Sequence, residues 1–179
     1  AHHDDLRSAD YVDKCVRVLD ENPSVVLCYA KTKFIDREGV ELGFDESDLA
    51  VDAPQPSRRF HDLLCLDHQC LPLHGVIRND LLKESELIGP YSNSDKVLLA
   101  QLSLYGPFHQ LSEYLFYNRR HEDQAVSAYS NDHLRTVLWY DPQADGGQPV
   151  FPFWNYLRHA LATVRSSPLP WAERMRCYR

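Results

Sequence analysis

Glycine is scarce in this sequence, with 7 residues among 179. The glycine-rich loops that cradle phosphates in nucleotide-binding folds do not occur, and neither do the serine-hydrolase elbow or the zinc-protease helix motif. No apolar run approaches the roughly 18 to 20 residues that a membrane-spanning helix needs. These absences remove the commonest phosphate-binding, hydrolase and zinc-protease signatures from consideration.

Basic residues are outnumbered by acidic ones, 19 to 26, which gives a formal charge of −7 at pH 7. Surfaces that wrap nucleic acid concentrate Lys and Arg, so the charge argues against a nucleic-acid partner. The five cysteines are odd in number and scattered, at Cys15, Cys28, Cys65, Cys70 and Cys177. A secreted disulfide scaffold would be denser and shorter, and we therefore expect reduced thiols in a cytoplasmic protein.

The remaining composition is that of a globular domain, with 44% hydrophobic and 25% charged residues. The length suffices for one domain with a core and is too short for two of average size. Periodicity predicts helices at 8–21, 59–66, 80–87, 94–105 and 154–164, and strands at 24–30, 32–35, 40–42, 71–78, 108–111 and 114–117. This order of elements indicates an α/β or α+β fold.

The first polar cluster is His2-His3-Asp4-Asp5. Adjacent carboxylates repel each other, and a divalent cation relieves that repulsion. Hard oxygen ligands suit Mg²⁺ or Mn²⁺, which often keep positions open for substrate phosphates. The structural alternative is that these carboxylates precede a helix and stabilise the positive end of its dipole.

The second cluster, Ser94-Asp95, opens the most regular predicted helix. Ser94 is a natural N-cap and Asp95 a favourable first-turn residue, which is the structural interpretation. The functional interpretation makes Asp95 a general base, because the positive end of a helix favours the ionised carboxylate that accepts a hydroxyl proton.

The third cluster, Arg119-Arg120-His121, directly follows an apolar strand. Arginine suits bidentate contact with phosphate oxygens, and a neutral histidine can bind a metal or donate to a leaving oxygen. A solvated loop is the structural alternative.

A fourth group combines cysteine and histidine within one short segment, at His61, Cys65, His68, Cys70 and His74. Such residues can hold zinc. Their spacing is loose and leucines alternate with them, so half-buried thiols are the favoured interpretation.

Taken in order along the chain, these segments resemble the family 2 glycosyltransferases, which have a GT-A fold. The matching segments are His3-Asp4-Asp5-Leu6, Val25–Tyr29, Ile35–Gly39, His74–Leu81, Ile88–Tyr91, Ser94–Gly106 and Tyr117–His121 followed by Gln124 and Ser127. The resemblance rests on the order of these segments and spans more than two thirds of the chain. It implies a partial GT-A fold, α/β in class, with a mixed sheet and flanking helices.

The resemblance also implies roles for single residues. Asp4 and Asp5 would match the family's motif for the metal and the nucleotide-sugar diphosphate, with His121 as a further metal ligand. Arg119 and His121 would belong to the loop that closes over the donor diphosphate, next to Asp4. Asp95 would be the catalytic base that deprotonates the acceptor hydroxyl.

Four further residues would lie near the acceptor and the donor sugar by the same resemblance, namely His74, Gly75, Arg78 and Ser94. The implied cofactor is Mn²⁺ or Mg²⁺. The implied activity is transfer of a sugar from a nucleotide-sugar donor, a UDP-sugar above all, to a hydroxyl of a glycan, lipid-linked or small-molecule acceptor, as in cell-surface polysaccharide or glycan biosynthesis. A base opposite the departing diphosphate implies inversion at the anomeric carbon. The alternative is a non-catalytic GT-A-like module for binding or assembly.

Residues 1–128 would form the second half of a GT-A domain that begins at the Asp motif. The family's nucleotide-binding half precedes that motif and is expected to lie outside this chain. We therefore expect the chain alone to be inactive, with a bare sheet edge and apolar faces that favour homo-oligomers.

Residues 129–179 would form a mostly helical tail that is rich in aromatic residues and arginine. The aromatic side chains are Phe151, Phe153, Trp154, Tyr156 and Trp171. Helix packing on the domain is the favoured interpretation of this tail. The alternative is contact with an anionic membrane surface, which would place the protein at the inner face of the membrane.

Overall fold

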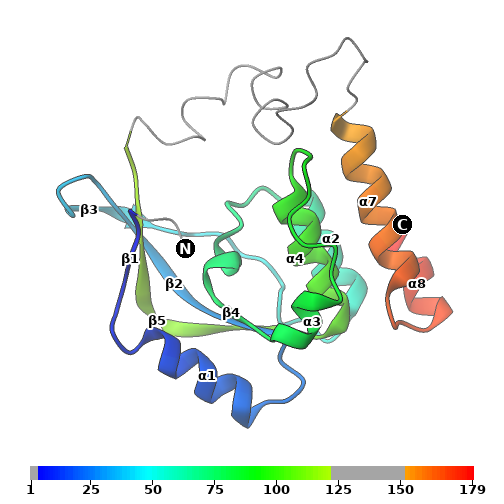
Figure 1. Ribbon diagram of the computed structural model, residues 1–179, viewed down its shortest axis with the longest axis horizontal. Helices are drawn as coiled ribbons and strands as arrows, with labels where there is room; N and C mark the ends of the chain where they lie inside the picture. Colours follow the sequence, from blue (N-terminus) through cyan, green and yellow to red (C-terminus); the bar gives the residue numbers. More distant parts are fainter. Residues whose placement is uncertain (1–3, 122–151) are drawn as a thin grey trace.

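The computed structural model describes residues 4–121 and 152–179 (Figure 1). Four residues named above, His2, His3, Gln124 and Ser127, lie outside the described residues, as does the boundary between residues 128 and 129. Phe151 also lies outside them.

The helices and strands follow one another in the order β1 (Leu6–Arg7), α1 (Tyr11–Glu21), β2 (Leu27–Ile35), β3 (Glu41–Phe44), α2 (Pro56–Cys65), the 3-10 helix η1 (Leu71–His74), β4 (Val76–Ile77), α3 (Asn79–Lys83), α4 (Ser94–Tyr105), β5 (Phe108–Arg119), α7 (Pro152–Ser166) and α8 (Trp171–Cys177).

Five strands form one mixed sheet in which β2 and β5 are the long central pair. The order is β1-β5-β2-β3, and β4 pairs with the first residues of β2 on the β3 side. β2 and β5 run parallel over their whole length, from Leu27 opposite Phe108 to Ile35 opposite Arg119, while the other pairs are antiparallel. The expected α/β architecture with a mixed sheet and flanking helices is confirmed.

Strand β2 divides the core between the two faces of the sheet. Leu27 and Tyr29 belong to the larger apolar cluster, whereas Cys28 and Ala30 belong to the smaller one. This alternation follows from the two-residue period of a strand. Helix α1 covers the smaller cluster, and α2 and α4 cover the larger one on the opposite face (Figure 1).

Helix α4 is the central helix of the larger cluster. Ser94 and all eight residues from Val97 to Leu104 are buried, so protein surrounds this helix on nearly every side. The guanidinium of buried Arg59, on α2, donates to the Ser103 carbonyl at 2.9 and 2.7 Å. This carbonyl is one of the last four of α4, which have no partner within the helix, so Arg59 ties α2 to the helix end.

The described part of the tail packs on the domain. Ala160 and Val164 of α7 are buried in the larger cluster, and the Tyr156 hydroxyl donates to the Leu64 carbonyl at 2.8 Å. Helix α8 packs against α2 and α7 (Figure 1). None of the helices in the two described ranges has the length and apolar character needed to cross a membrane.

Three sequence predictions of strands were wrong in their boundaries. The predicted strands 24–30 and 32–35 correspond to one strand, β2, which begins at Leu27. The predicted strands 108–111 and 114–117 likewise correspond to one strand, β5, which continues through the register shifts opposite Lys31. Segment 71–78 holds one turn of 3-10 helix before β4. Cys70 has a positive φ of 55° and Pro72 cannot donate to a ladder, so the chain turns there.

Gly75 is the point where this turn meets the sheet. A Cβ at Gly75 would lie 2.3 Å from the Cys28 carbonyl oxygen and 2.8 Å from the Tyr29 Cβ. No other residue type fits against β2 at this distance, and Gly75 thereby sets how closely η1 and β4 approach the sheet.

We predict that Gly75→Ala lowers the free energy of unfolding by about 3 kcal/mol, the upper end of the usual cost of overpacking. Gly39→Ala is the matched control, because Gly39 has open space around it and a φ of +89°. It should lose only about 1 kcal/mol from backbone strain. Chemical denaturation measures both values, and equal losses would contradict the close approach at Gly75.

Candidate functional site

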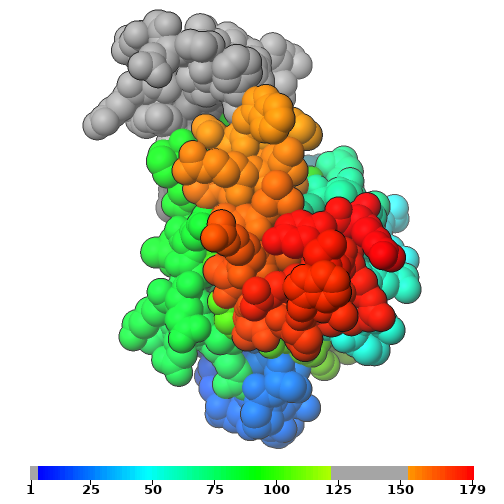
Figure 2. All heavy atoms as spheres, turned by 90° about the vertical axis from the view of Figure 1, so that its right-hand side faces the viewer, coloured from blue at the N-terminus to red at the C-terminus, as the bar shows by residue number. Residues whose placement is uncertain are grey.

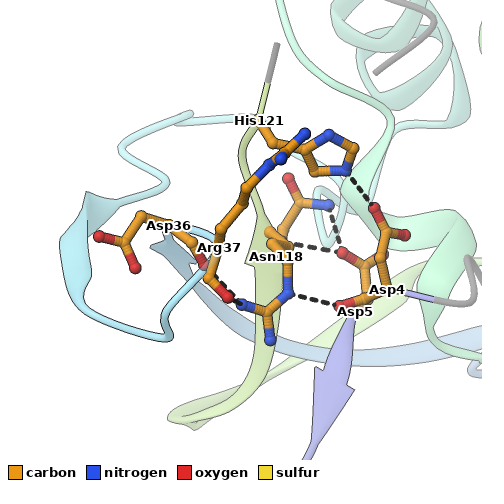
Figure 3. Close-up of polar contacts among 7 residues, drawn as sticks. Asp4, Asp5, Asp36, Arg37, Asn118 and His121 are labelled. Carbon is orange, nitrogen blue, oxygen red and sulfur yellow. Dashed lines mark hydrogen bonds and ion pairs between the residues drawn. The ribbon is translucent and has the colours of Figure 1, made fainter. Parts of the chain in front are cut away.

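The parallel pairing of β2 with β5 brings three distant segments to one end of the sheet. Ile35, the last residue of β2, lies opposite Arg119, and the β2–β3 turn begins at Asp36. β1 pairs with the same end of β5, where Leu6 lies opposite Tyr117. Residues 4–5, 36–37 and 118–121 therefore converge (Figure 3).

Asp5 is fixed by the end of β5. Its Oδ1 accepts a hydrogen bond from the Asn118 side-chain amide at 3.0 Å and another from the Arg119 backbone N–H at 2.9 Å (Figure 3). Its Oδ2 is buried and has no hydrogen-bond partner among the described residues. One carboxylate oxygen is thus held by the fold, and the other is left for a ligand.

The Arg119 guanidinium joins all three segments through backbone carbonyls. Its Nε donates to the Asp4 carbonyl at 2.9 Å, and its Nη1 donates to the Asp36 and Arg37 carbonyls at 2.6 Å each. These contacts make Arg119 a structural tie at the site.

His121 Nε2 and Asp4 Oδ2 lie within hydrogen-bond distance, 2.8 Å apart (Figure 3). Their side chains are 18% and 19% exposed, so the pair is largely shielded from water. The other ring nitrogen, Nδ1, is buried and has no hydrogen-bond partner among the described residues. The imidazole of the third cluster thereby meets a carboxylate of the first cluster.

Asp4 and Asp5 bring two carboxylates, the ligand type that hard divalent cations prefer, to this end of the sheet. In residues 4–121 and 152–179, no group of three or more His, Cys, Asp and Glu side chains is arranged to hold a metal ion. Mg²⁺ often takes only one or two carboxylates and completes its shell with water and substrate phosphates. Asp5 and Asp4 are the two carboxylates at this end of the sheet that such a mode would use.

Arg120 is a further cation at the site, and nothing in the sequence distinguishes it from its neighbours in the third cluster. Its guanidinium lies 4.4 Å above the Phe34 ring and donates to the Gln69 side chain. Burial lowers the pKa of Arg120, and the charges of Asp5 and Asp45 oppose that effect. A half-buried guanidinium beside the carboxylates can neutralise part of an incoming anion.

Asp95 lies at the start of α4, beside the loop that Arg120 reaches. Burial raises the pKa of the Cys70 thiol, and the charge of Asp95 and a hydrogen bond with it raise that pKa further. Gln69, which precedes Cys70, accepts from Arg120. Arg120, which feels the charge of Asp5, therefore contacts the loop that also neighbours Asp95.

The other predicted site residues do not join this cluster. Arg78 donates to the carbonyls of Val25, Leu19 and Asn22, beyond the opposite end of β2. There it satisfies free carbonyls at the end of α1 and in the turn that follows.

Two of these residues serve packing. The His74 ring stacks on Phe116, with 4.6 Å between centroids, and its carbonyl accepts from Tyr11. Gly75 packs against β2 as described above.

Ser94 is fully buried at the start of α4, and its Oγ has no hydrogen-bond partner among the described residues.

Of the three histidines in the fourth cluster, His68 forms a hydrogen-bond bridge between two backbone groups. His68 Nε2 lies 2.9 Å from the Leu63 carbonyl, and Nδ1 lies 3.1 Å from the Cys70 backbone N–H. A carbonyl only accepts and an N–H only donates, so the ring is neutral with its hydrogen on Nε2. Both ring nitrogens are engaged and Cys65 is exposed, which leaves the zinc alternative without support.

Comparison with protein-family models gives no match, and comparison with curated proteins gives none either.

We predict that acid destabilises the protein partly through His68. Burial lowers its pKa, and the hydrogen bond to Leu63 opposes that shift. The unfolded chain binds a proton at His68 as the pH falls below about 6.5, whereas the folded chain binds it only at lower pH. The free energy of unfolding therefore decreases as the pH falls from about 6.5 toward the lower pKa of His68 in the folded protein.

His68→Gln tests this source of pH dependence, because the amide can donate to Leu63 and accept from Cys70 without taking up a proton. The free energy of unfolding should depend less on pH below about 6.5 in the variant than in the parent protein. His109→Gln, at an exposed position, is the control and should keep the parent slope. Equal slopes in all three proteins would remove His68 as the cause.

We further predict that Arg119→Lys destabilises the protein by about 1–3 kcal/mol, because one ammonium group cannot replace the guanidinium at three carbonyls. Arg17→Lys, on the exposed face of α1, should change stability by less than about 0.5 kcal/mol. Thermal unfolding measures both. A loss at Arg119 no larger than at Arg17 would show that the tie contributes nothing.

Proposed function

We propose that this chain carries the metal- and diphosphate-binding end of a GT-A glycosyltransferase of the family 2 type. The reaction would transfer a sugar from a nucleotide donor, a UDP-sugar above all, to an acceptor hydroxyl with inversion. Mn²⁺ or Mg²⁺ would be the cofactor.

One observation carries the proposal. Asp4 and Asp5 are more than a hundred positions from Asn118 and His121, yet they form one hydrogen-bonded cluster at the end of the central strands. The resemblance assigns both segments to the same task, metal and diphosphate binding. Two independent lines, motif order and spatial convergence, thus support the same assignment.

Some residues of the cluster orient the Asp5 carboxylate, and others would contact the ligand. Asn118 and the Arg119 backbone orient the Asp5 carboxylate through Oδ1, which leaves Oδ2 directed to a ligand. Asp5 and Asp4 would hold the cation, and bound metal would stabilise charge on the departing diphosphate. Arg120 would add a positive charge on the same side.

Asp95 is the proposed base. Its Oδ1 accepts from the Lys96 backbone N–H at 2.8 Å, at the positive end of a twelve-residue helix. This position sets the carboxylate in the first turn of α4, beside the backbone N–H groups that have no partner within the helix. An ionised Asp95 would take the proton of the acceptor hydroxyl as the oxygen attacks the anomeric carbon.

A second candidate function is a non-catalytic GT-A-like module for binding or assembly. The observation that favours it is that the Arg119 guanidinium and His121 are already engaged within the protein. Side chains with internal partners must give them up, or share them, to bind a diphosphate.

The experiment is metal-dependent release of free nucleotide from a panel of nucleotide sugars, using the longest translation product that contains this chain. We expect slow hydrolysis of one donor, lost on chelation and restored by Mn²⁺. Asp5→Asn and Asp95→Asn should each lower the rate at least about a hundredfold, as expected for loss of a charge-stabilising or proton-accepting group.

Both substitutions keep an oxygen that can accept the backbone hydrogen bonds, so the fold should survive. Asp20→Asn, at an exposed position on α1, is the matched control and should retain full activity. A folded protein that hydrolyses no donor and shows no thermal shift with UDP and Mn²⁺ would replace the transferase with the non-catalytic module. Full activity in Asp95→Asn would remove that residue from its role.

A further inference from the structure

We propose that the outer surface of α7 and α8 docks on an anionic lipid surface. The two helices lie together on one face of the molecule, α7 above α8 (Figure 2). The inference is independent of the proposed function, because it concerns a surface remote from the carboxylate cluster in the fold and uses no catalytic residue.

Large apolar side chains on this surface are exposed to an unusual degree. Phe153 and Trp154 of α7 are 70% and 64% exposed, and Trp171 of α8 is 76% exposed. Leu161 and Met175 are exposed as well. Single exposed apolar residues are normal, but several on two adjacent helices indicate an interaction surface.

Within residues 4–121 and 152–179, other side chains of α7 and α8 make the contacts with the domain. The inner side of α7 buries Ala160, Thr163 and Val164, and Tyr156 bonds to the Leu64 carbonyl. Helix α8 is tied to the preceding turn by Arg174, which donates to the carbonyls of Leu169 and Ser167. The helices are therefore held in place, with their outer side chains presented in a fixed arrangement.

The charge of this region is opposite to that of the rest of the chain. Residues 152–179 hold five arginines and one glutamate, a formal charge of +4, which leaves −11 for residues 1–151 of a chain with a total of −7. Arg158 and Arg165 are exposed and form no ion pair with any described residue. Trp154, Arg158, Leu161 and Arg165 follow helical spacing and share one side of α7.

Arginine interleaved with tryptophan, phenylalanine and leucine on a helix surface matches the chemistry of a bilayer interface. The arginines reach anionic headgroups, and the apolar side chains enter the boundary with the acyl chains. Leu161 and Met175 gain little from a nucleic acid, whose bases stack on aromatic groups. A symmetric contact with a second copy would set arginines against arginines.

Co-sedimentation with vesicles tests the proposal. We expect binding to equimolar phosphatidylserine and phosphatidylcholine, weakened by salt, and none to phosphatidylcholine alone. Arg158→Gln with Arg165→Gln should weaken binding roughly 25-fold, about fivefold per arginine, which corresponds to about 1 kcal/mol for each basic residue at an anionic surface. Trp154→Ser with Trp171→Ser should weaken it at least about tenfold.

Matched controls carry the same changes elsewhere. Val40→Ser with Leu42→Ser removes two side chains of 60% and 59% exposure from the β2–β3 hairpin, and Arg17→Gln with Lys83→Gln removes two exposed positive charges. Both control variants should bind vesicles like the parent protein, and all variants should keep its unfolding transition.

Three results would overturn the proposal. The first is no binding to anionic vesicles, and the second is equal loss of binding in the test and control variants. The third is binding of an RNA oligonucleotide, or self-association in sedimentation velocity, that the Trp154 and Trp171 substitutions abolish while vesicle binding stays unchanged.

Discussion

The parallel pairing of β2 with β5 is the constraint on which the rest of the structure depends. It aligns the two long strands so that Ile35 and Arg119 end side by side. The same pair provides both faces of the core, with α1 on one and α2 and α4 on the other. Everything proposed for the carboxylate cluster follows from this register, because a shift of the pairing would separate Asp5 from Asn118 and the β2–β3 turn from Arg119.

The candidate site combines groups that are satisfied with groups that are not. Arg119 donates hydrogen bonds to the carbonyls of Asp4, Asp36 and Arg37 and thereby joins three segments at the site. Asp5 Oδ2 and His121 Nδ1 are buried without partners in the described part of the chain, and such groups are costly unless something binds them. This contrast favours a ligand-binding site over a purely structural network. Both candidate functions, the transferase and the non-catalytic module, would use that site.

The sequence allowed prediction of the features that local patterns determine. Helix α4 was predicted at its observed limits, because its apolar residues are continuous and Gly106-Pro107 ends it. Strand β1 was not predicted, since two exposed residues show no pattern and only the pairing with β5 defines them. In the site, the convergence of Asp4 and Asp5 with His121 came from motif order, whereas the carbonyl contacts of Arg78 at the far end of β2 depend on tertiary packing that no local pattern shows.

The central claim is that the Asp4–Asp5 end of the sheet binds a divalent cation. Paramagnetic line broadening by Mn²⁺ in an NMR spectrum of the protein tests it most directly, because broadening falls steeply with distance from the ion. The account predicts selective broadening of the Asp4, Asp5, Asn118 and His121 resonances, and its loss in Asp5→Asn. Broadening centred on the acidic loop around Asp45 and Asp48, or no selective broadening at all, would contradict it.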